Sequence, residues 1–150
     1  MEAFLNEVQQ KLTACAALKA IDEDWGQLDS YSPNPPTVFP CALIDITDLL
    51  FSNIGKDNSA SPVNRQMAEG TITIIIANLK LSNTNERAPK SQKQNAWKIW
   101  TIIEDIHKLL HGWKPTSASG ALMRTRLRRI RRDDGIQEYQ VTYSIGMSNV

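Results

Sequence analysis

The densest group of chemically active side chains in this 150-residue chain is a run of arginines near its C-terminal end. Six arginines fall between Arg124 and Arg132. A guanidinium group is planar and binds phosphates or carboxylates through paired hydrogen bonds. Three interpretations stay open: contact with nucleic-acid phosphates, ion pairs with carboxylates of a neighbouring subunit, or a solvated strand whose charges block unwanted strand pairing. No aromatic residue alternates with the arginines, so the base stacking typical of single-strand binders is not expected.

The two histidines are the next candidates for chemistry. His107 and His111 are four residues apart and share one face of a predicted helix, with Glu104 nearby. Such a pair can hold a metal ion, but the HExxH spacing is absent and no distant Cys or His completes a ligand set. We interpret the histidines as part of a solvated helix face and predict no metal site.

The carboxylates considered for acid–base chemistry are residues 22–24 and the pair Asp45 and Asp48. Paired carboxylates can transfer protons when they line one pocket, and nothing in the sequence brings these two groups together. The motifs GxGxxG, GxxxxGK[ST] and GxSxG do not occur in the sequence. We therefore predict no catalytic residue and no cofactor.

The composition is that of an ordinary globular protein, with 41% hydrophobic residues, 22% charged residues and a net charge of +1. We expect one domain over residues 1–150. Cys15 and Cys41 have no CxxC partner, and we interpret them as buried thiols in a reducing compartment, with a disulfide as the alternative. The sequence carries neither a signal-peptide pattern nor a membrane-length apolar run, so we expect synthesis in a cytoplasm.

Apolar periodicity predicts the elements that position these groups. Helical spacing predicts a first helix over 2–20 and a long second helix over 92–112. Alternating or β-branched runs predict strands, at 21–28, 38–51 and 66–81, and a closing hairpin at 120–147. Polar, Pro- or Gly-containing stretches predict long loops, at 29–36, 52–65 and 82–93. The order α-β-β-β-α-β-β predicts an α+β fold, a mainly antiparallel sheet of about five strands with two helices packed on one face.

The turn of the closing hairpin, Asp133-Asp134-Gly135, decides which arginines point outward. A two-residue loop would place arginines on the apolar face of the second strand, at the cost of desolvating them. A three-residue loop with Gly135 in the left-handed conformation avoids this, and we prefer it. The pairs that it predicts are Leu127 with Val141, Met123 with Ile145, Arg126 with Thr142 and Arg128 with Gln140, with Arg124, Arg126 and Arg128 on one outward face.

Tryptophans and scattered cations complete the set of surface candidates. We interpret Trp100 and Trp113 as core residues, and we place Trp97 at the rim of the long helix, where an interface would use it. The predicted interface candidates are Arg124, Arg126, Arg128, Arg131, Arg132, Arg87, Lys90, Lys93 and Trp97.

Several features of the layout occur together in one known family. An amphipathic helix is followed by an acidic strand with Trp25, and a Pro-rich loop leads into a strand entered at Phe39-Pro40. The long helix closes with His111-Gly112-Trp113, and an Arg-rich hairpin ends the chain. In this layout, which covers most of the chain, the sequence resembles the tail terminator (tail completion) proteins of long-tailed bacteriophages and related prophages.

The resemblance implies a non-enzymatic virion protein that forms a ring, usually a hexamer, at the head-proximal end of the tail tube. Such a ring stops tube polymerisation and presents a surface to the head connector. The implied partners are further copies of the chain, the tail-tube protein and the head–tail connector or sheath protein, with passing DNA as a further contact and no membrane. The implied location is the tail or neck of the virion, after assembly in the host cytoplasm. The alternative function is a small Arg-rich nucleic-acid-binding module.

Overall fold

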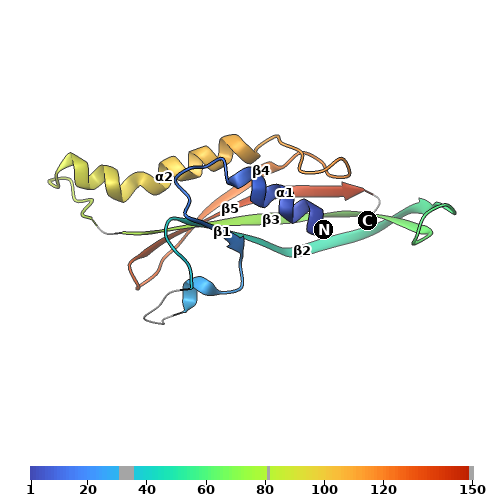
Figure 1. The fold of residues 1–150 in the computed structure, drawn as a ribbon, viewed down its shortest axis with the longest axis horizontal. Coiled ribbons are helices and arrows are strands. Elements are labelled where there is room, and N and C mark those ends of the chain that lie inside the picture. Colours follow the sequence, from blue (N-terminus) through green and yellow to red (C-terminus); the bar gives the residue numbers. More distant parts are fainter. Residues whose placement is uncertain (31–35, 81, 149–150) are drawn as a thin grey trace.

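The computed structural model describes residues 1–30, 36–80 and 82–148, which form a five-stranded sheet with two α-helices on one face (Figure 1). The fold is therefore α+β, as the sequence predicts. The elements in chain order are α1 (Glu2–Leu12), β1 (Ala20–Glu23), the 3-10 helix η1 (Gln27–Asp29), β2 (Cys41–Lys56), β3 (Asn64–Leu79), α2 (Lys90–Leu110), β4 (Met123–Ile130) and β5 (Ile136–Ser148). Neither helix in these ranges is long and apolar enough to cross a membrane.

The strand order is β1-β2-β3-β5-β4, with β1 parallel to β2 and every other neighbouring pair antiparallel. The central strand, β3, contains the β-branched run 71–76, whose side chains pack well on both faces of a covered sheet. The acidic β1 and the arginine-rich β4 are the two outermost strands.

The main core lies between the sheet and the two helices. The buried helix residues recur at helical spacing: Phe4, Val8, Leu12, Ala96, Ile99, Ile102, Ile103, Ile106 and Leu110. They pack on alternate residues of three strands, including Ala42, Ile44, Ile72, Ile74, Val141 and Tyr143. Each fully buried aliphatic side chain contributes about 1.5–3 kcal/mol relative to an exposed one, so this face holds most of the apolar stabilisation.

The opposite face, which we call the open face, carries a smaller cluster. Leu28 of η1 packs there against Leu43 and Ile75. Further along the open face the side chains become polar, and the hydroxyls of Thr73 and Thr142 lie 3.3 Å apart across β3 and β5. This face is covered by η1 at one end and presents hydrogen-bonding groups at the other.

Two predicted boundaries near the N-terminus were wrong. The first helix ends at Leu12, and the Thr13 hydroxyl donates a hydrogen bond to the Gln10 carbonyl, a local bond that competes with further helix. The first strand ends at Glu23 because Gly26, with φ +90°, turns the chain into η1. Trp25, which was predicted on that strand, is consequently 61% exposed.

The predicted loop over 52–65 was also wrong, because β2 and β3 continue through most of it. Ser52 pairs with Met67 and Lys56 with Asn64, which leaves a connection of seven residues, 57–63. Most residues in 52–65 are polar and none of them is buried, so they carry no burial pattern from which a strand could be predicted. We call the ribbon over residues 50–67 the arm; it projects well beyond the helices (Figure 1).

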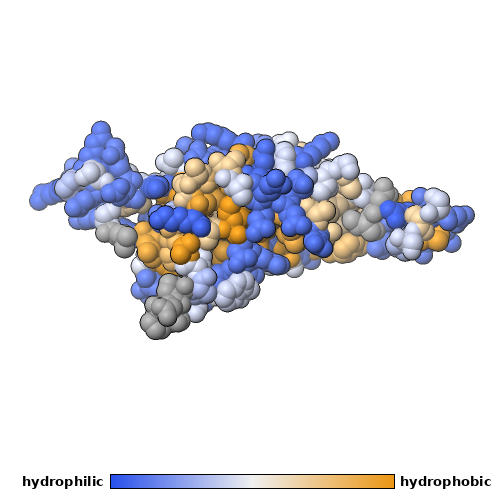
Figure 2. Space-filling model, in the orientation of Figure 1, coloured by the Kyte–Doolittle hydropathy of each residue, from blue (hydrophilic) through white to orange (hydrophobic). Residues whose placement is uncertain are grey.

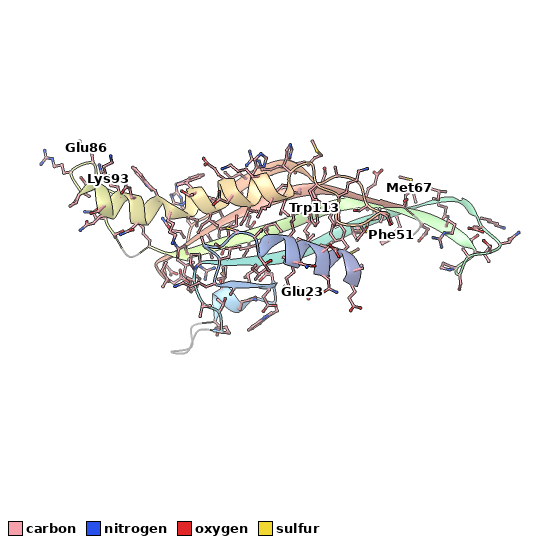
Figure 3. All side chains as sticks on the ribbon, turned by 45° about the horizontal axis from the view of Figure 1, so that its top comes forward. Glu23, Phe51, Met67, Glu86, Lys93 and Trp113 are labelled. Carbon is pink, nitrogen blue, oxygen red and sulfur yellow. The ribbon has the colours of Figure 1, made fainter. Side chains whose placement is uncertain are left out.

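The arm has free edges and exposed apolar side chains. In the described parts of the chain, β1 pairs with β2 only as far as Ile44, and β5 pairs with β3 only from Met67 onward. The exposed apolar residues of the arm are Leu50, Phe51, Ile54, Val63 and Met67. Apolar atoms are visible among hydrophilic ones near its tip in Figure 2, and Phe51 and Met67 are labelled at its base in Figure 3. A two-stranded ribbon of this kind is only marginally stable in water by itself.

The base of the arm depends on a glycine. The pairing of β2 with β3 is irregular between Asp45 and Asp48, and the irregularity brings β2 backbone against Gly70. A Cβ at Gly70 would clash with the Asp48 carbonyl oxygen and lie 2.9 Å from Cδ2 of Leu49.

We therefore expect Gly70→Ala to lower the free energy of unfolding by roughly 1–3 kcal/mol, the range for overpacking, as measured by urea unfolding. Gly146→Ala is the matched control, because Gly146 lies on the neighbouring strand opposite Glu69 and a Cβ there meets nothing within 4 Å. Equal stability of the two variants would contradict this explanation of the arm base.

Candidate functional site

The register of the arginine strand largely follows the prediction. Leu127 pairs with Val141, Arg126 with Thr142 and Arg128 with Gln140, and Gly135 has φ +77°. These pairs confirm the preferred register.

The first part of the strand differs from the prediction. Thr125 is an extra residue between two paired positions, so Met123 lies opposite Ser144 and not Ile145, and Arg124 lies opposite Tyr143. Tyr143 belongs to the core under the helices. The prediction that Arg124 shares the outward face of Arg126 and Arg128 was therefore wrong, because a bulge shifts all side chains that precede it.

Arg126 and Arg128 are the free cations of the open face. Paired residues of adjacent strands point to the same face, so these arginines lie on the side of Thr142 and Gln140, away from the helices. Both are exposed, as are Arg124 and Arg129 on the same strand. Within the described residues none of the four forms an ion pair. We call Arg126 and Arg128 the basic edge.

Arg132, also predicted as an interface candidate, is used inside the chain. Its side chain is 9% exposed and its guanidinium satisfies all five N–H donors. Nε and Nη2 donate to the Asp134 carboxylate at 3.0 and 2.7 Å, and Nη1 donates to Asp29 at 2.8 Å and Glu138 at 3.0 Å. Nη2 also donates to the Leu28 carbonyl at 2.7 Å. Arg132 therefore ties η1 to the hairpin turn.

The pKa values of two carboxylates that bind Arg132 are shifted in opposite directions. The hydrogen bond from Arg132 lowers the pKa of Asp134 below its ordinary value of 3.8. Burial raises the pKa of Glu138 above 4.5, and the bond from Arg132 opposes this rise. Buried Glu138 thus depends on Arg132 to remain ionised at low energetic cost. Asp29 could not have been chosen as a partner from the sequence, because it lies 103 residues away from Arg132.

The remaining predicted candidates lie elsewhere. Arg87, Lys90, Lys93 and Trp97 are on or just before the first two turns of α2, since the helix begins at Lys90, earlier than predicted. Arg87, Lys90 and Trp97 are exposed, and the Lys93 ammonium donates to the Glu86 carbonyl. This end of α2 projects past the sheet on the side away from the arm (Figure 3). The structure therefore divides the candidates into two groups, and Arg131 belongs with the hairpin as an exposed turn residue.

The structure brings together carboxylates that the sequence left apart. Glu23 pairs with Ile44, so the chain after β1 runs beside Asp45, and the Asp24 N–H donates to the Ile44 carbonyl at 2.9 Å. Burial, followed by repulsion from Asp24 and Glu23, raises the pKa of Asp45. We call Asp22 and Asp24, with Asp45 behind them, the acidic edge. The sequence feature that could have indicated this edge is the two-residue spacing of Asp22 and Asp24, which equals the spacing of Arg126 and Arg128.

Within the described residues, no cation neutralises the acidic edge. Asp22 and Glu23 are exposed, and Asp24 is partly exposed. Across the described residues neither these groups nor Asp45 forms an ion pair. Figure 3 shows Glu23 at the margin of the sheet.

The histidines and cysteines make contacts within the fold and do not form a metal site among the described residues. The rings of His107 and His111 lie 4.7 Å apart, and His111 Nδ1 accepts the backbone N–H of Arg124 at 3.1 Å. Among the described residues no group of three or more His, Cys, Asp or Glu side chains could hold a metal ion. Cys15 and Cys41 are buried free thiols, and burial raises the pKa of both, that of Cys41 to about 11.

The tryptophans follow the prediction in part. Trp97 is 50% exposed, and Trp113 is half-buried against the core with the Lys11 ammonium 5.2 Å from its ring centre. Trp100, predicted as core, is 42% exposed and packs against Tyr139, with 4.8 Å between ring centres and a tilt of 57° between the rings.

A hollow of about 700 Å³ lies between α1 and the segment that leads to β1. Its lining includes Asn6, Gln9, Thr13 and Lys19, but no histidine or carboxylate. This hollow offers no general acid–base pair.

No protein-family model matches the sequence, and no curated protein matches it. In fold, the chain is similar to a chain in the solved structure of the virion of a native gene transfer agent (GTA) particle. The match covers 96% of this chain and 93% of the other, with a TM-score of 0.53 and 10% sequence identity. At this identity the similarity establishes a shared fold.

The Arg132 network makes a prediction about stability. Arg132→Ala would leave Glu138 buried without its cation, so we expect the free energy of unfolding to fall by roughly 3–5 kcal/mol. Arg131→Ala, one position away at an exposed side chain, should change it by less than about 0.5 kcal/mol. Chemical denaturation of both variants measures this, and a small effect of Arg132→Ala would contradict the role of the network.

The same network predicts a pH dependence. Without Arg132, the pKa of folded Glu138 rises further above its ordinary value, so the folded variant binds a proton that the unfolded chain has released. When the pH is lowered from about 7 to about 4.5, the difference in free energy of unfolding between the wild type and Arg132→Ala should then become smaller. Wild-type Asp134, with its lowered pKa, loses its contribution only below this window. The variant Arg132→Ala/Glu138→Gln should show no such narrowing, and a constant gap for Arg132→Ala would refute the assignment.

Proposed function

We propose that this chain is a non-enzymatic virion protein, one subunit of a homo-oligomeric ring of six copies. The ring caps the head-proximal end of a phage-like tail tube and joins it to the head connector. The tube-end position follows from the resemblance of the sequence layout to tail terminator proteins, and the fold shared with a gene transfer agent virion chain supports a virion role.

The observation that carries the proposal is the arm. It exposes five large apolar side chains on a ribbon whose edges pair with no further strand of the described residues, and it projects beyond the helices. Exposed apolar surface of this kind marks a contact with another protein, and free strand edges accept a further strand. In a ring subunit, the apolar side chains and the strand edges of the arm would both contact a neighbouring subunit or the tube end.

The charge distribution favours a protein partner over nucleic acid. Arg126 and Arg128 are free to bind phosphate, but a polyanion long enough to span the sheet would also meet the acidic edge, which repels it. Among the described residues, the open face beside these arginines carries Thr142 and Gln140 and no aromatic ring on which bases could stack. Nucleic-acid binding therefore remains the second candidate, carried by the exposed arginines of β4 that form no ion pair within the described residues.

We expect Leu50→Ser/Phe51→Ser to abolish ring formation and tube capping without unfolding the chain, because both side chains are more than half exposed. Native mass spectrometry would count the subunits. Electron microscopy of purified tail-tube protein, with and without the chain, would show whether tube length becomes limited.

The control is Leu79→Ser, which removes an exposed apolar side chain from the opposite end of β3 and should leave assembly intact. A wild-type protein that stays monomeric with and without tube protein, and never limits tube length, would overturn the proposed function.

A further inference from the structure

The basic and acidic edges lie on the same face and in the same rows of the sheet. One row runs from strand to strand as Asp22, Leu43, Ile75, Gln140 and Arg128. Because residues paired across neighbouring strands point to the same face, Asp22 and Arg128 both lie on the open face, at opposite ends of one row.

The next row on this face repeats the arrangement. It runs Asp45, Thr73, Thr142 and Arg126, and Asp24 continues it beyond β1, next to Asp45. Each edge therefore carries two like charges with a spacing of two residues, about 7 Å along an extended strand. The spacing of the cations matches the spacing of the anions.

These charges cannot neutralise each other within one molecule. The two edges are separated by four strand spacings, or roughly 19 Å, which exceeds the screening length of about 8 Å at physiological ionic strength. Two cations therefore lie at one margin of the sheet and two anions at the opposite margin. Neither group has a partner of opposite charge within the described residues.

The strand directions allow the two edges to meet in register. From the parallel β1–β2 pair and the three antiparallel pairs, β4 runs opposite to β1. When the β4 margin of one copy lies beside the β1 margin of the next, the two strands are antiparallel. Arg128 opposite Asp22 then places Arg126 opposite Asp24.

We propose that the basic edge of each subunit binds the acidic edge of the next copy, with Arg128 facing Asp22 and Arg126 facing Asp24. This inference rests on the proposed ring function and names its subunit contact. The contact joins different surfaces of identical chains, so it is head-to-tail and generates a closed ring when the rotation between copies closes. The partner is a second copy of this chain, because a β4-to-β4 contact would place like charges together.

The test is a charge exchange between the two edges. Arg126→Glu/Arg128→Glu and Asp22→Arg/Asp24→Arg each place like charges across the contact and should weaken self-association roughly 100-fold or more. The combined fourfold variant restores opposite charges and the wild-type net charge, so it should assemble again. Sedimentation velocity at low salt measures association, and circular dichroism confirms that each variant is folded.

The matched control is Lys98→Glu/Lys108→Glu, which changes the net charge by the same amount as the arginine variant. Both lysines are exposed on α2, away from both edges, and neither is a predicted interface candidate. It should assemble like the wild type. The arginine variant is the safer of the two edge variants, since its replaced side chains make no ion pair within the described chain, whereas Asp24 accepts a hydrogen bond from the Gly26 N–H.

The outcomes separate this inference from the function on which it rests. A wild type that never forms rings overturns the proposed function. Wild-type rings that persist unchanged in the folded arginine variant overturn the head-to-tail contact alone, as does a folded fourfold variant that stays monomeric. Tight binding of duplex DNA that disappears in the arginine variant, with assembly unchanged, would reassign the basic edge to nucleic acid.

Discussion

The surface of this protein depends on the backbone pairing of its central strand. β3 is hydrogen-bonded to β2 on one side and to β5 on the other over most of its length, and a shift of one residue would exchange the two faces of the sheet. That register places the helix-facing side chains in the core. It also places two carboxylates and two guanidinium groups in matching rows on the open face. Burial on one face therefore fixes charge on the other.

Neighbouring arginines of the same run have opposite roles because their surroundings differ. Arg132 has three carboxylates and a carbonyl within hydrogen-bond distance and is nearly buried. Arg126 and Arg128, six and four residues earlier, have no carboxylate partner in the described chain. Arg132 stabilises the attachment of η1 to the hairpin. The charges of Arg126 and Arg128 remain to be balanced by a partner. The arm adds a second surface that is incomplete in a single subunit.

The features that could be predicted from the sequence were those set by burial. Apolar spacing predicted α2 and the order of helices and strands along the chain, and the cost of desolvating arginines predicted the pairing of Leu127 with Val141. The arm could not be predicted, because both faces of a ribbon that no other element covers are exposed, and its residues show no alternation of polar and apolar side chains. No sequence pattern indicated the bulge at Thr125, which moves the Arg124 side chain to the opposite face of the sheet. The acidic edge required the parallel pairing of β1 with β2, which depends on residues that are distant in the sequence.

The most direct measurement of the contact between subunits is chemical cross-linking through a pair of new cysteines, Glu23→Cys and Leu127→Cys in one chain. These positions occupy one row between the two proposed ion pairs, all four charged side chains remain, and the native Cys15 and Cys41 are buried. A short bis-maleimide should convert assembled protein into covalent multimers up to the size of the ring. Rings that yield only monomers after complete reaction of both cysteines would contradict the head-to-tail contact.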